Sequence, residues 1–77
     1  MEVMVLFYGV LADVAGTRFK SYPEVESFGD LKIRIFDDFP EIINYKFSIF
    51  HNNALADEEP VLNNGDEIAL LPPFIGG

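Results

Sequence analysis

The sequence predicts an α+β domain in which one main helix packs across one face of a mixed sheet of four to five strands. The chain has 77 residues, which suffice for one domain, and 49% of them are hydrophobic. A chain this short needs such a composition to fold alone. Its patterns follow the order strand, strand, helix and then two or three strands. One helix can cover only one face of such a sheet.

The first part of the chain predicts two strands with a helical turn between them. Residues 3–8 are apolar throughout, which favours a strand buried on both faces. Residues 10–15 can form one helical turn that ends at Gly16, a natural position for a left-handed cap. Residues 17–22 alternate polar with aromatic side chains before Pro23, which is typical of a half-buried strand. We expect the two strands to pair antiparallel.

A single amphipathic helix is predicted from Phe28 to about Phe39. Ser27 followed by Asp30 resembles a capping box, and Pro40 marks the end of the helix. At about 100° per residue, one helix face collects the apolar side chains. These are Phe28, Leu31, Ile35, Phe36 and Phe39.

Two features of this helix do not follow from core packing. Ile33 points away from the apolar face, as single apolar residues on protein surfaces often do. Asp37 and Asp38 lie near the C-terminal end, where negative charge is unfavourable. This placement hints at a cationic neighbour, either Lys46 or a partner protein.

The second part of the chain predicts the remaining strands. Residues 47–51 form a strand candidate, and a short strand at residues 54–55 follows a turn. Residues 63–66 read Asn-Asn-Gly-Asp, a strong turn because Asn-Gly tolerates positive φ. This turn leads into a last strand over residues 67–71. The intervening helix allows the first and last strands to lie side by side in parallel.

Charge and composition exclude several classes of function. Thirteen acidic residues against five basic ones give a net charge of −8. This balance argues against nucleic acid and anionic membranes as partners and favours a basic protein surface. The absence of cysteine excludes a disulfide scaffold, a zinc ribbon and a thiol nucleophile. We expect His51, the one histidine, to be exposed or capped and expect no metal site.

The N-terminal segment gives no targeting pattern. It lacks the positive region and the small-residue cleavage site of a signal peptide. No apolar run reaches the ~20 residues of a transmembrane helix. We therefore expect a cytoplasmic protein.

After a domain of residues 1–71, residues 72–77 predict an extended, flexible tail. Pro72 and Pro73 stiffen the chain and cannot extend a sheet. Two large apolar residues follow, and the final Gly76 and Gly77 suit close approach inside a narrow channel. A frayed terminus is the alternative. In a chain without thiols, the carboxylate of Gly77 is the reactive group that remains, and we expect the tail to enter a pocket of a partner.

Two blocks of the sequence carry a resemblance to a known family. Residues 64–77 combine Gly-Asp-Glu, an apolar strand, Pro-Pro and a final Gly-Gly, and residues 5–17 combine a first strand with the loop after it. Both blocks resemble the MoaD family, the sulfur-carrier small subunits of molybdopterin synthase, within the wider MoaD/ThiS superfamily. The Pro-Pro pair separates this tail from the related thiamin sulfur carriers, which usually lack it. The resemblance implies a ubiquitin-like β-grasp fold, in agreement with the order of elements.

The resemblance also implies a carrier that is not an enzyme on its own and binds no cofactor stably. An E1-like (MoeB-like) adenylyltransferase would use ATP to convert the Gly77 carboxylate into an acyl-adenylate. A sulfur donor would then convert it into a thiocarboxylate. In the synthase, the tail would enter the large (MoaE-like) subunit and deliver sulfur to the pyranopterin precursor of the molybdenum cofactor. Two small and two large subunits would form a heterotetramer.

Specific residues follow from the resemblance. Gly77 carries the reactive group, and Gly76 keeps its approach unhindered. The rest of the segment in the partner's channel consists of Pro72, Pro73, Phe74 and Ile75.

Three apolar residues of the predicted strands have two interpretations. Phe7, Leu70 and Leu71 can serve the core or a surface that faces a partner. Core is the favoured interpretation for Phe7, whereas the two are balanced for Leu71.

Two other functions stay open. One is a ThiS-like sulfur carrier for another product, such as the thiazole of thiamin, a sulfur amino acid or a tungsten cofactor. The other is a ubiquitin-like protein modifier that is joined through Gly77 to a lysine by an isopeptide bond.

Overall fold

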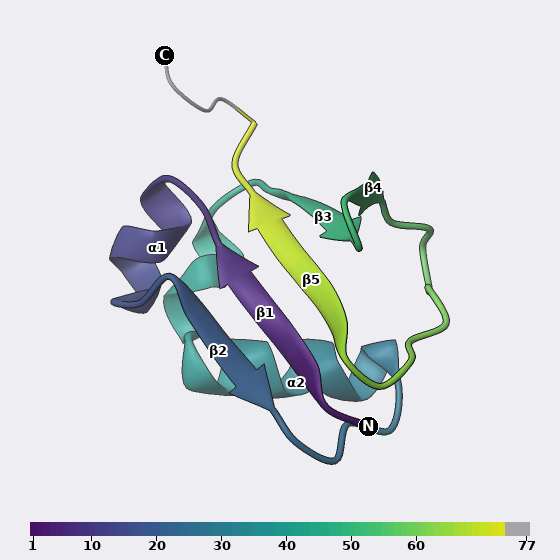
Figure 1. Ribbon diagram of the computed structural model, residues 1–77. Helices are drawn as coiled ribbons and strands as arrows, with labels where there is room; N and C mark the ends of the chain where they lie inside the picture. The colour runs from purple at the N-terminus through teal and green to yellow at the C-terminus, as the bar shows by residue number, and fades with distance from the viewer. Residues whose placement is uncertain (74–77) are drawn as a thin grey trace.

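Five strands form one mixed sheet, across which one long helix packs in the computed structural model (Figure 1). The structure describes residues 1–73. The predicted tail residues Phe74, Ile75, Gly76 and Gly77 lie outside the described residues. In spatial order, the strands are β2 (Phe19–Tyr22), β1 (Val3–Phe7), β5 (Asp66–Leu71), β3 (Ser48–His51) and β4 (Ala54–Leu55). This arrangement confirms the predicted ubiquitin-like β-grasp fold.

The pairing of the strands follows the prediction. β1 pairs antiparallel with β2 and parallel with β5, so the first and last strands lie at the centre of the sheet. β3 pairs antiparallel with both β5 and β4. β1 and β5 run in the same direction and therefore end at the same edge, where the chain leaves β5 toward the C-terminus (Figure 1).

The long helix α2 (Phe28–Asp38) begins as the capping pattern predicts. The Ser27 hydroxyl accepts a hydrogen bond from the Asp30 amide at 3.1 Å. The reciprocal bond differs from a capping box, because the Asp30 carboxylate accepts from the amide of Glu26 at 3.0 Å instead of from that of Ser27. These two bonds satisfy the amides of Asp30 and Glu26 at the start of the helix.

Two shorter helices complete the fold. The predicted helical turn is α1 (Val10–Ala15), and Gly16 ends it in the left-handed conformation with φ of 73°. Pro40 was expected only to end the helix before it, whereas a 3-10 helix, η1 (Pro40–Asn44), begins at this residue. Proline suits a first helical position because its missing N–H has no partner there. No helix of residues 1–73 is long and apolar enough to cross a membrane.

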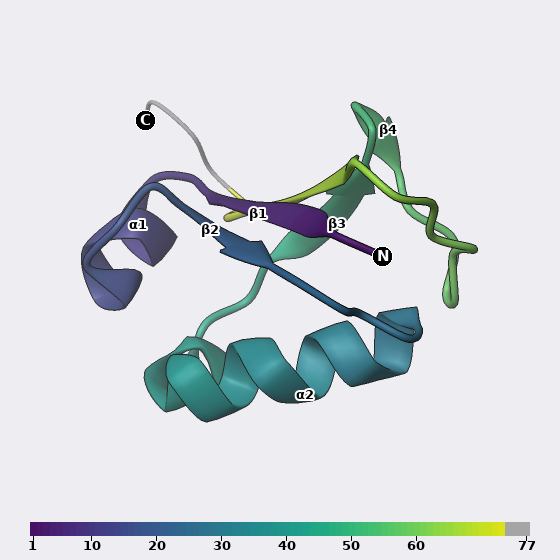
Figure 2. The ribbon, with the colours of Figure 1, turned by 60° about the horizontal axis from the view of Figure 1, so that its bottom comes forward.

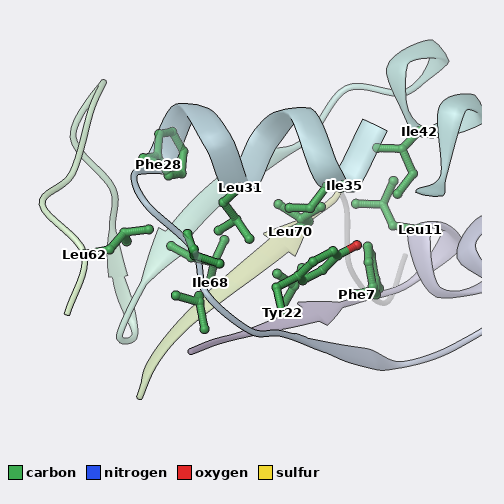
Figure 3. Packing of buried hydrophobic residues seen from close by; sticks show 13 residues of the cluster. Phe7, Leu11, Tyr22, Phe28, Leu31, Ile35, Ile42, Leu62, Ile68 and Leu70 are labelled. Carbon is green, nitrogen blue, oxygen red and sulfur yellow. The ribbon is translucent and has the colours of Figure 1, made fainter. Parts of the chain in front are cut away.

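The core lies between α2 and the sheet (Figures 2 and 3). Phe7 meets Phe39 edge to face, with 5.0 Å between ring centroids. Ile42 of η1 and Leu11 of α1 close the core at the end where β1 finishes (Figure 3). The largest fully buried side chains are Leu11, Leu31, Ile42, Ile68, Leu70, Val3 and Val5.

The prediction that residues 3–8 are buried on both faces is wrong. Val3 and Val5 are fully buried under α2, but Met4 between them is 37% exposed. The reason is that a helix packs on one side of the sheet only. α2 lies beneath the sheet, and within residues 1–73 no helix covers the opposite face (Figure 2).

Candidate functional site

The root of the predicted tail lies at the edge of the sheet where β1 and β5 end. The Tyr8 amide donates a hydrogen bond to the Leu70 carbonyl at 3.1 Å, just beyond the end of β1. β1 then turns at Gly9 into α1, while β5 continues into Pro72 and Pro73. Pro72 is half-buried and Pro73 is exposed. The fold therefore brings the start of the tail against the turn between β1 and α1.

A row of apolar side chains crosses the sheet face opposite α2. Partners in register lie on the same face of a sheet, so one row can be followed through all five strands. This row consists of Phe19, Leu6, Ala69, Phe50 and Leu55. We call it, together with Tyr8 and Leu71 beside the tail root, the outer-face patch.

The outer-face patch remains accessible although its members are apolar. Phe19 is 56% exposed and Leu55 is 70% exposed, and Tyr8 is also exposed. Exposed apolar side chains that gather on one face are typical of a surface that binds another protein. The patch reaches the tail root through Leu71, the last residue of β5.

The structure separates the three strand residues that had two interpretations. Phe7 is 3% exposed and Leu70 is 2% exposed, so both belong to the core under α2. Of the two interpretations the burial supports the core, which was the favoured one for Phe7, because alternation along β1 and β5 turns both side chains toward the helix. Leu71 is half-buried and faces the outer side. The other members of the patch were not predicted, because alternation along β1 and β5 is hidden where both faces of a strand are apolar.

A surface hollow of about 470 Å³ adjoins the tail root. It lies where β1 passes into α1 and where β2 begins, so it connects the outer-face patch with the exposed side of α1. Two charged residues, Asp13 and Arg18, line the hollow. Its lining also includes the aromatic residues Tyr8 and Phe19. These groups can bind a protein segment, but within residues 1–73 they offer no nucleophile paired with a base.

Comparison with known proteins identifies the family. The sequence model of the ThiS family matches residues 5–77. The chain belongs to the ThiS family. The match includes the tail as well as the β-grasp domain.

Relatives of this ThiS-family chain include proteins of molybdopterin synthesis. The molybdopterin synthase sulfur carrier subunit of Aedes aegypti is 32% identical over 88 aligned positions, which cover 100% of this chain and 90% of that protein. A solved complex of subunits 1 and 2 of the molybdopterin-converting factor from Helicobacter pylori 26695 contains a similar chain. The two are 26% identical with a TM-score of 0.77, and the match covers 100% of both chains.

The same fold occurs in an archaeal modifier. The small archaeal modifier protein 1 of Haloferax volcanii is 22% identical to this ThiS-family chain, with a TM-score of 0.81. The match covers 95% of this chain and 98% of that one. At this identity the likeness shows the β-grasp fold.

A buried polar cluster holds the loop before β5 in this ThiS-family chain. The Asp66 carboxylate, 8% exposed as a residue, lies 2.6 Å from Nε2 of His51. It also accepts hydrogen bonds from the Asn52 side chain at 3.1 Å and from the Asn63 amide at 2.8 Å. The bond from His51, followed by the bonds from Asn52 and Asn63, lowers the pKa of Asp66 to about 2.

This cluster gives His51 a structural role that agrees with the predicted capped histidine. Within residues 1–73, no group of three or more His, Asp or Glu side chains could hold a metal ion. From the sequence, Asp66 was expected only to be part of a turn. No local pattern indicates that a residue 15 positions earlier would pair with it.

A second polar cluster lies between β2 and α2, at the other edge of the sheet face that α2 covers. Lys20 Nζ lies 2.6 Å from the Asp38 carboxylate, which also accepts a hydrogen bond from the Tyr22 hydroxyl at 2.8 Å. The bonds from Lys20 and Tyr22 lower the pKa of Asp38. Burial and the neighbouring Asp38 raise the pKa of Tyr22. The prediction of a cationic neighbour is therefore confirmed for Asp38, but the suggestion of Lys46 is wrong. The cation is Lys20 of β2.

Proposed function

We propose that this chain is the sulfur-carrier small subunit of a molybdopterin synthase. The observation that carries the proposal is the Pro-Pro-Phe-Ile-Gly-Gly sequence that follows β5 of a ThiS-family domain. The carrier from Aedes aegypti, which matches the whole length of this chain, supports molybdopterin over other products. The proposal includes a thiocarboxylate at Gly77 as the form in which sulfur is carried.

The proposed chemistry begins with a carboxylate that is a poor electrophile. An E1-like enzyme transfers AMP from ATP to the Gly77 carboxylate and releases pyrophosphate. The terminal sulfur of a persulfide attacks the carbonyl carbon and expels AMP, which leaves an acyl disulfide. A thiol then cleaves the sulfur–sulfur bond, is oxidised to a disulfide with the donor, and frees the thiocarboxylate. No step requires a catalytic side chain of the carrier, which agrees with the composition of the chain.

The proposed role of the tail is to carry this sulfur into the large subunit. There the thiocarboxylate sulfur attacks the pyranopterin precursor, and two such deliveries form the dithiolene that binds the metal. The glycines at positions 76 and 77 present no side chain to a narrow channel. Acid–base groups and cations that bind the substrate come from the large subunit.

We propose that the outer-face patch binds the large subunit. The patch is apolar, partly exposed and reaches the tail root through Leu71, so a protein bound there also lies where the tail begins. The net charge of −8 favours a partner with a basic rim around an apolar centre. The complex from Helicobacter pylori, in which subunits 1 and 2 associate, supports a partner of this kind.

The proposal extends to the assembly and the place of the reaction. Each large subunit takes one carrier, and two such pairs form the heterotetramer. Because activation consumes ATP and a reduced sulfur donor, we propose that the carrier works in the cytoplasm.

Mass spectrometry of the intact chain tests the carrier chemistry. After incubation with an E1-like enzyme, ATP and a sulfur donor, one oxygen of the Gly77 carboxyl group is replaced by sulfur. A chain with one residue added after Gly77 is the matched control, and it acquires no sulfur while its circular dichroism spectrum stays that of the wild type. Failure of the wild-type chain to acquire sulfur with any such enzyme contradicts the proposal.

A second candidate is a carrier for the thiazole of thiamin, which the match to the ThiS family favours. The thiocarboxylated chain separates the two candidates when it is mixed either with a molybdopterin synthase large subunit and the pyranopterin precursor or with a thiazole synthase. Formation of dithiolene supports the first candidate, and formation of thiazole alone supports the second. Isopeptide conjugates to lysine without sulfur transfer would identify a modifier instead.

A further inference from the structure

The turn between β1 and α1 contacts the first residue of the tail. We propose that Gly9 is a positioning residue for the tail: it seats the Pro72 ring and so determines the direction in which the chain leaves the sheet. The consequence for sulfur transfer rests on the proposed function, because that function places the reactive group at the end of the tail.

The backbone of Gly9 has a conformation that glycine adopts easily. Its φ of 57° and ψ of −134° lie outside the regions allowed to L-residues with a side chain. Hydrogen bonds hold the turn on both sides of this residue. The Gly9 carbonyl accepts from the Ala12 amide at 3.0 Å, and the Tyr8 carbonyl accepts from the Leu11 amide at 3.1 Å. Together with the bond from Tyr8 to Leu70, they fix the turn over the end of β5.

The space next to Gly9 is filled by the tail root. A Cβ atom on Gly9 would lie 3.0 Å from Cγ and 3.7 Å from Cδ of Pro72. Carbon atoms prefer separations of about 3.5–4.0 Å, so a methyl group on Gly9 requires the ring to give way by a few tenths of an ångström. Pro72 is half-buried in this position. The ring therefore rests on the bare backbone of the turn.

Two other glycines provide an internal comparison. Gly16 and Gly65 also have positive φ, of 73° and 86°, but within residues 1–73 no heavy atom beyond the adjacent residues would lie within 4 Å of a Cβ on either. They need glycine for conformation alone. Gly9 combines the conformational requirement with a contact to the tail.

Pro72 and Pro73 restrict the backbone, so the position of the Pro72 ring affects the direction of the chain after it. Each proline ring restrains φ near −65°, and consecutive prolines act as a semi-rigid spacer. A rotation of the Pro72 ring therefore changes the direction of the chain beyond Pro73. The proposed reactive group lies five residues beyond Pro72, so the direction of the chain at Pro72 and Pro73 bears on where sulfur is delivered.

A spin-label experiment tests the direction of the tail without any partner. The chain has no cysteine, so Phe74→Cys creates a unique site for a nitroxide. Broadening of amide NMR signals in residues 1–73 then reports which part of the domain the label approaches. Gly9→Ala shifts the set of broadened amides, whereas Gly16→Ala, which introduces strain without a contact to the tail, leaves it unchanged. Pro72→Ala removes the same contact from the tail side and provides the readout if Gly9→Ala does not fold. An unchanged set in every folded variant of Gly9 and Pro72 overturns the inference.

Sulfur transfer supplies the functional readout. In single turnover with the large subunit, thiocarboxylated Gly9→Ala reacts at least about tenfold more slowly than the wild type, since a misplaced reacting group loses its productive geometry. Gly16→Ala stays within about twofold of the wild type when rates are corrected for the folded fraction. Equal rates for Gly9→Ala and the wild type overturn the inference alone. A wild-type chain that never acquires sulfur overturns the proposed function, while the spin-label result still decides the role of Gly9.

Discussion

The two faces of the sheet are made by the same strands and both carry apolar side chains, yet they differ in burial. On the face under α2, Val5 and Ile68 are fully buried. On the other face, Leu6 and Ala69, which alternate with them along β1 and β5, are only partly buried, and Phe19 and Leu55 are largely exposed. The central strands therefore supply one apolar surface to the core and a second one to the solvent.

The difference teaches that hydrophobicity in this chain serves two purposes. This domain has one long helix, α2, and it covers one face of the sheet. Apolar side chains on the other face add little to the stability of the isolated domain, because no layer of the domain covers them. These side chains can instead be buried when a partner protein binds. The covered face should accordingly respond to mutation through stability, and the outer face should respond through binding.

The largest effect on stability is expected at the centre of the covered face. Ile68→Ala leaves a cavity under α2, and we expect a loss of about 2–5 kcal/mol in the free energy of unfolding. Urea denaturation followed by circular dichroism measures the loss. Ile68→Val, which removes one methyl group, serves as the control with a loss of about 1 kcal/mol. A loss below that of the valine variant would contradict the assignment of this face to the core.

The polar edge of the covered face should show the next largest effect. Asp66→Asn weakens the hydrogen bonds from His51 and Asn52, and we expect a loss of about 2 kcal/mol at pH 6. The folded pKa of Asp66 lies near 2, below its ordinary value of 3.8. Its contribution is therefore complete above about pH 4 and is lost as the pH falls through 2. Urea titrations between pH 6 and pH 2 should show the gap between the two proteins closing; a gap that stays constant contradicts this account.

The edge between β2 and α2 should contribute less. Asp38→Asn removes the charge that pairs with Lys20, but the two side chains are 37% and 43% exposed. Because solvent and salt screen such a pair, we expect a loss below about 1 kcal/mol. Thermal unfolding at low and high salt measures it, and the difference between variant and wild type should shrink at high salt. A larger loss that is independent of salt would point to the hydrogen bond from Tyr22 instead.

The smallest effect on stability is expected on the outer face. Leu55→Ser should change the free energy of unfolding by less than about 0.5 kcal/mol, because Leu55 is 70% exposed. The same change should weaken binding to the large subunit about tenfold, as measured by calorimetry. Ile33→Ser on α2 is the matched control, since Ile33 is 64% exposed but lies outside the outer-face patch. If both variants bind equally well, the outer-face patch is not the docking surface.

Much of the fold could be predicted because its determinants are local. The apolar run of β1, the Ser27 cap and the Asn-Gly turn each act through neighbouring residues. The boundaries of the helices and strands therefore agree closely with the expected ones. The 3-10 helix at Pro40 was missed because proline both ends one helix and begins the next.

The candidate site could be predicted only in part. Phe7 and Leu70 were considered for a partner surface, yet they lie in the core. An apolar run such as residues 3–8 does not reveal which of its faces a helix will cover. The contact between Gly9 and Pro72 is equally remote from sequence patterns, because it joins residues from opposite ends of the chain.

By itself, the sequence determined the order of the elements, the acidic charge, the absence of thiols and the Pro-Pro-Phe-Ile-Gly-Gly tail. These properties depend on residue identity and on interactions between neighbours along the chain. Only the tertiary structure decided which apolar side chains form the core, which remain on the outer face, and which partners Asp66, Asp38 and Pro72 have. These depend on the parallel pairing of β1 with β5 and on the position of α2, which bring distant residues together.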